Sequence, residues 1–192
     1  ERPTGSSDPY ALRRAGNGVL LILWNQGWKL DLNVFLAKSV EAWKELFPAF
    51  AVDTAQLTSD LSALLRQRIT SQLEDDGYAT DLVQAVAGDT VSTTRLLRDP
   101  LDVRVRIQLL RGLRDQGRLT AVQAVVQRAS RLAEKGDLPL EVLSSTEVVD
   151  PSRFESASEK GLFDATKQLN PLAANGAYQE LCDVLVESTP AL

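Results

Sequence analysis

Residues 57–73 read LTSDLSALLRQRITSQL, and the spacing of their apolar side chains decides the fold class. These side chains recur every three or four positions, which places them on one face of a helix: Leu57, Leu61, Leu64, Leu65, Ile69 and Leu73. We expect the helix to be capped by Thr58, Ser59 or Asp60 and to end at Gly77. No segment shows the convincing alternation of a half-buried strand. The sequence therefore predicts an all-α helical bundle.

Similar patterns predict helices on both sides of this one. Two precede it, one from about Pro9 to Gln26 and one from Asp31 or Asn33 to Pro48. Five follow it, at residues 82–87, 100–116, 119–133, 154–169 and 177–186. Residues 89–99 are expected to be a loop, residues 136–151 a linker, and Asn170-Pro171 a turn. The aromatic residues of the second helix are expected in the core: Phe35, Trp43 and Phe47.

Composition limits the possible functions. The chain has 192 residues, 44% of them hydrophobic and 24% charged, which is typical of one or two globular domains. No apolar run approaches the roughly 20 residues that span a bilayer, so no membrane partner is expected. The single cysteine, Cys182, is expected in the core. There is no histidine and no glycine-rich phosphate loop, so we expect neither catalysis nor a metal site within the chain.

The positive charge is concentrated in one quarter of the chain. Residues 91–135 contain ten basic and four acidic side chains, a net charge of +6, whereas the whole chain carries −5, which leaves −11 for the remainder. Arg104 and Arg111 are seven residues apart and are expected to share one helix face. A local basic surface of this kind is typical of RNA binding, although the same arginines could instead lie on ordinary solvated helix faces.

Two short motifs point to a known family. Residues 3–15 read PTGSSDPYALRRA, in which Ser7 or Asp8 can cap a helix and Pro9 suits its first turn. Residues 81–86 read DLVQAV. In this order and spacing, the two motifs resemble the bacterial-type glycyl-tRNA synthetase beta subunit. The resemblance covers nearly the whole chain and is weakest over residues 91–151.

The resemblance implies a domain organisation. Residues 1–54 would be a helical connector that follows an HD-like region. Residues 55–192 would form an anticodon-binding-like helical domain, similar to that of arginyl-tRNA synthetase and lacking its last helix. The chain would then be an excised fragment of a larger subunit.

The resemblance also implies a function. The whole enzyme would be a cytoplasmic alpha2beta2 tetramer that joins glycine to tRNA(Gly) with ATP, the alpha subunit supplying the adenylate chemistry. This chain would hold tRNA and bind no cofactor of its own. Its arginines are expected to neutralise tRNA phosphates: Arg95, Arg98, Arg104, Arg111, Arg114, Arg128 and Arg131.

One alternative remains open. The chain could be a helical protein-interaction scaffold with no RNA role, in which residues 91–135 meet an acidic protein partner. This reading is supported by the acidic overall charge and by the absence of aromatic residues, which would stack on bases, from residues 91–135.

Overall fold

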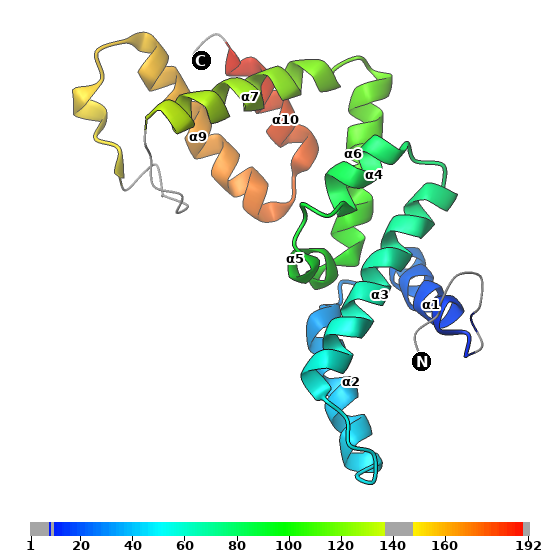
Figure 1. Ribbon diagram of the computed structural model, residues 1–192. Helices are drawn as coiled ribbons and strands as arrows, with labels where there is room; N and C mark the ends of the chain where they lie inside the picture. Colours follow the sequence, from blue (N-terminus) through cyan, green and yellow to red (C-terminus); the bar gives the residue numbers. More distant parts are fainter. Residues whose placement is uncertain (1–7, 9, 137–147, 190–192) are drawn as a thin grey trace. The chain divides into compact units, whose positions relative to one another are not determined.

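The computed structural model describes residue 8, residues 10–136 and residues 148–189 (Figure 1). All regular structure in these residues is helical, and they contain no strand. The prediction of an all-α fold is therefore confirmed for the described part of the chain. The chain divides into two compact units, Glu1–Gln108 and Leu109–Leu192.

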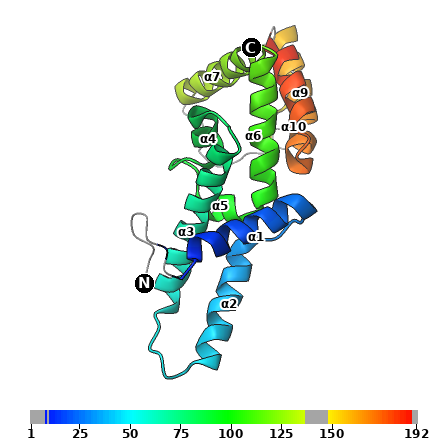
Figure 2. The ribbon, with the colours of Figure 1, turned by 90° about the vertical axis from the view of Figure 1, so that its right-hand side faces the viewer.

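Helix α3 (Thr54–Asp75) is the centre of the first unit. It contacts four other helices, α1 (Leu12–Gln26), α2 (Leu32–Leu46), α4 (Thr80–Ala87) and α5 (Thr93–Arg98). Figures 1 and 2 show α2 running alongside the N-terminal half of α3. The periodic side chains Leu65, Ile69 and Leu73 are buried, as the spacing predicts. Burial of this stripe stabilises the unit because it removes apolar surface from water.

The two long helices α1 and α3 begin at residues other than those predicted. The α3 cap is Asp53, whose carboxylate accepts the Gln56 N–H, and not one of residues 58–60. Helix α1 begins at Leu12, because Ala11 has a left-handed backbone conformation with φ of 55°. Asp8 nevertheless caps α1 as expected, since its carboxylate accepts the N–H groups of Leu12 and of the next residue.

The prediction that the aromatic residues of α2 lie in the core is wrong. Phe35 and Phe47 are 47% and 45% exposed, and Trp43 is also exposed. The buried face of α2 consists of Leu32, Leu36 and Val40, which are spaced by four residues. Trp43 and Phe47 continue this stripe at spacings of three and four residues, but they pack against each other and against Phe50 instead of entering the core.

Residues 89–99, predicted as a loop, contain the short helix α5. Leu96 and Leu97 anchor it, because both side chains are completely buried. A helix of six residues has too few hydrogen bonds to be stable alone. Tertiary contacts therefore decide the conformation of this segment.

Helix α6 (Pro100–Asp115) begins at Pro100, as predicted. Its residues Pro100, Val103 and Ile107 are buried in the first unit, whereas Val105 is exposed. The indole N–H of Trp24 donates a hydrogen bond to the Pro100 carbonyl at 2.9 Å. The start of α6 is thereby tied to α1.

The second unit contains α7 (Leu119–Lys135), the 3-10 helix η1 (Pro151–Arg153), α9 (Ala157–Asn175) and α10 (Tyr178–Glu187). Helix α10 contacts both α7 and α9. Cys182 is buried, which confirms its expected place in the core, and burial raises the pKa of its thiol. The predicted turn at Asn170-Pro171 is wrong, because α9 continues through Pro171 to Asn175 and is terminated by Gly176, whose φ is 69°.

The predicted domain boundary at residues 54 and 55 stays a prediction. In the structure, α1 and α2 pack on α3 within one compact unit. Most of the expected linker at residues 136–151 lies outside the described residues. No helix within the described residues combines the length and apolarity that a membrane crossing requires.

Candidate nucleic-acid interface

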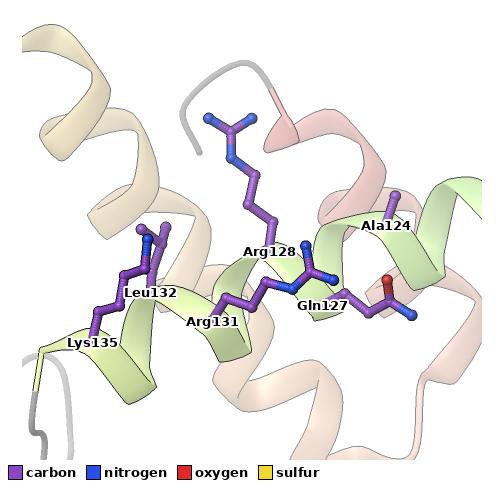
Figure 3. A pocket seen from close by; sticks show the side chains of 6 residues that line it. All are labelled: Ala124, Gln127, Arg128, Arg131, Leu132 and Lys135. Atoms are coloured by element: carbon purple, nitrogen blue, oxygen red, sulfur yellow. The ribbon is translucent and has the colours of Figure 1, made fainter.

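One face of α7 carries three basic side chains, Arg128, Arg131 and Lys135. All three are exposed, and their spacing of three and four residues places them side by side along the helix. They line a cavity of about 390 Å³ together with Ala124, Gln127 and Leu132 (Figure 3). We call these six residues the α7 face.

The α7 face is basic without internal neutralisation. Among the described residues, no acidic side chain forms an ion pair with Arg128, Arg131 or Lys135. Sequence reasoning selected the two arginines but not Lys135, which the spacing from Arg131 could have added. The face can therefore offer three cationic groups to an anionic partner.

A second basic group lies on α5 in the first unit. Arg95 and Arg98 are both exposed, on a helix that is fixed by its buried leucines. Arg98 also acts on a neighbouring acid, Asp31. Partial burial raises the pKa of Asp31, but hydrogen bonds from Asn33 and Val34, together with the charge of Arg98, hold it below its ordinary value.

Arg104 has partners within the molecule. Its guanidinium lies 5.3 Å from the centre of the Trp24 ring and 3.9 Å from the Asp76 carboxylate. Its side chain is only 29% exposed, and its Nε is buried with no hydrogen-bond partner in the described residues. This geometry favours a structural role that joins α6 to α1 and α3.

The remaining candidates lie near the end of α6. Arg111 is exposed and lies 3.9 Å from Asp115, one helical turn further on. Arg114 is half-buried. The seven predicted site residues thus divide between the units, with Arg95, Arg98 and Arg104 in the first and the other four in the second.

Arg118, just before α7, was not a predicted site residue, and the structure gives it a structural role. Its guanidinium donates a hydrogen bond to the Asp183 carboxylate on α10. This hydrogen bond, with the positive charge of Arg118, holds the pKa of Asp183 below its ordinary value. The pair therefore links the start of α7 to α10.

Replacing Asp183 by Asn is expected to reduce the stability of the second unit at pH 7. A carboxyl group with a lowered pKa in the folded state stabilises above its unfolded pKa, and this stabilisation is lost as the pH falls through the folded value. The difference between wild type and D183N in urea unfolding should therefore shrink toward about pH 3. A difference that stays constant between these pH values would show that the ion pair is not its cause.

Metal-dependent chemistry has no candidate site in the described part of the chain. No group of three or more acidic, cysteine or histidine side chains there is placed to hold a metal ion. The arrangement that the structure does offer is cationic and exposed, which is suited to phosphate contact.

Comparison with known proteins identifies relatives for the whole chain. Residues 1–88 match the family described as glycyl-tRNA synthetase beta subunit. The chain is 37% identical to the glycine-tRNA ligase beta subunit of Picosynechococcus sp. and 39% identical to that of Acaryochloris marina. Each match covers 99% of this chain and 27% of the relative. The chain thus spans about a quarter of the length of these curated relatives.

Proposed function

Because this chain belongs to the glycyl-tRNA synthetase beta subunit family, we propose that it binds tRNA(Gly) in support of glycine attachment. The relatives are named as ligase subunits, and their names specify glycine and tRNA. A tRNA carries a phosphate on every nucleotide, so its contact surface on the protein should be cationic.

The α7 face is the observation that carries this proposal. Its three basic side chains are exposed and have no acidic partner among the described residues. Cationic side chains bind phosphate with release of counterions, which gives affinity without base specificity. Arg95 and Arg98 on α5 are proposed as further phosphate contacts. Arg104 is less suited to this role because Trp24 and Asp76 already contact it.

The proposed contribution to catalysis is positioning. A protein surface that holds one part of a tRNA raises the effective concentration of its acceptor end at a distant active site. We place that active site, and the use of ATP, in the alpha subunit of a cytoplasmic alpha2beta2 enzyme. We further propose that residues 55–192 form an anticodon-binding-like domain similar to that of arginyl-tRNA synthetase, and that the anticodon arm is therefore the region of contact.

Titration of labelled tRNA(Gly) and of an unrelated tRNA against the chain tests this function. We expect tighter binding of tRNA(Gly), and for both RNAs a loss of affinity of about 250-fold between 50 and 200 mM salt if five cations contact phosphate. Poly-glutamate, titrated in the same way, represents an acidic protein partner. Binding of poly-glutamate with no binding of either tRNA would instead favour a scaffold that meets an acidic protein.

A further inference from the structure

Arg66 of α3 fastens the segment that joins α4 to α5. One terminal nitrogen, Nη1, donates to the Val91 carbonyl and to the Thr93 hydroxyl, both at 2.8 Å. The other, Nη2, donates to the Gly88 carbonyl. The Arg66 side chain is only 17% exposed, so these hydrogen bonds are largely shielded from water.

The same segment is constrained at two further points. The Asn33 side chain on α2 donates a hydrogen bond to the Thr94 carbonyl at 2.9 Å. At Gly88, a Cβ atom would lie 2.4 Å from the Gln84 carbonyl oxygen, so only glycine fits there without a shift. The backbone between α4 and α5 is therefore held in one conformation.

The orientation of helix α5 depends on the conformation of this connecting segment. Its six residues are too few for independent stability, and its only completely buried side chains are Leu96 and Leu97. Arg95 and Arg98 flank these two leucines. The direction in which α5 presents its two arginines is thus set by the two leucines and by the hydrogen bonds to residues 88–94.

We infer that Arg66 is a positioning residue, whose guanidinium holds residues 88–93 so that α5 presents Arg95 and Arg98 to tRNA phosphates. The inference rests on the proposed function. Arginine suits this role because its planar fork serves three oxygen acceptors at once. Lysine keeps the charge, but its single nitrogen cannot reproduce the fork.

The test compares Arg66→Met and Arg66→Lys with a control, Arg14→Met. Arg14 is exposed on α1 in the same unit, so its replacement removes the same charge without touching the segment. Hydrogen exchange should become at least about tenfold faster at the amides of residues 91–97 in both Arg66 variants and remain unchanged in the control. The Arg66→Lys variant shows whether a positive charge at this position is sufficient to hold residues 88–93.

Binding of tRNA provides the second readout. Arg66→Met should weaken binding by the same factor as the double variant Arg95→Gln/Arg98→Gln, about tenfold at 0.1 M salt. Combining all three substitutions should add nothing further, because Arg66 acts through the two arginines. A general loss of stability would instead weaken binding in the double-variant background as well.

Each outcome decides the inference. Unchanged exchange in Arg66→Met would overturn it, whether or not tRNA binds. Faster exchange with undiminished tRNA affinity would also overturn it, but would leave the α7 face as the proposed contact. Wild-type affinity in Arg66→Lys, with normal exchange, would show that charge alone suffices and would contradict the role of the fork. Failure of the wild-type chain to bind tRNA would reject the proposed function itself.

Discussion

A chain in which Arg128, Arg131 and Lys135 are all replaced by Gln is expected to bind tRNA at least about tenfold more weakly at 0.1 M salt. The three side chains share one exposed face of α7 and have no acidic partner among the described residues, so their replacement should leave the fold intact. The dependence of the logarithm of the association constant on that of salt concentration should become shallower by about 2 to 3 units. Fluorescence anisotropy at four or more salt concentrations measures both effects.

A matched control removes three positive charges from the first unit. Arg14, Lys29 and Lys38 are exposed, and no ion pair to them is formed within the described residues. Their joint replacement by Gln gives the same net charge as the α7 variant. Equal losses in the two variants would mean that overall charge, and not the α7 face, governs binding. Full tRNA affinity in the α7 variant would reject the face as a contact.

Replacing Ile69 by Ala is expected to lower the free energy of unfolding of the first unit by about 2 to 4 kcal/mol. Ile69 is completely buried on α3, the helix that contacts four others, so the deletion should leave a cavity that the packed helices can fill only in part. All three tryptophans, Trp24, Trp28 and Trp43, lie in this unit. Tryptophan fluorescence during urea unfolding therefore reports its stability selectively.

Val126→Ala provides the comparison for the core substitution. Val126 is an exposed residue of α7 in the second unit, so its truncation should cost less than about 0.5 kcal/mol and should not shift the tryptophan transition. A loss below about 1 kcal/mol for Ile69→Ala would show that α3 is not the packing centre of the first unit.

Local patterns predicted the long helices because their signals lie within the helices themselves. The apolar stripe of α3 reads directly as a helix, and Pro100 marks the start of α6. A short polar residue beside the first turn marks two helix starts: Asp8 caps α1 as predicted, and the helix predicted to begin at Asp31 or Asn33 is capped by Asp31. It was misplaced for α3 because three polar residues that follow the true start offered equally good caps.

The remaining features depend on contacts between distant parts of the chain. Helix α5 lacks a periodic pattern and is held by Arg66 and Asn33, which precede it by many residues. The partly buried state of Arg104 follows from the Trp24 ring beside it. Sequence spacing predicted only that Arg104 and Arg111 share one helix face, since spacing does not identify which neighbouring helix covers that face.

The salt dependence of tRNA binding by the wild-type chain tests the central claim most directly. If the α7 face and α5 contact phosphates with five cations, the slope of the logarithm of the association constant against the logarithm of salt concentration should be about −4. A slope near zero, or no measurable binding at 50 mM salt, would contradict the account.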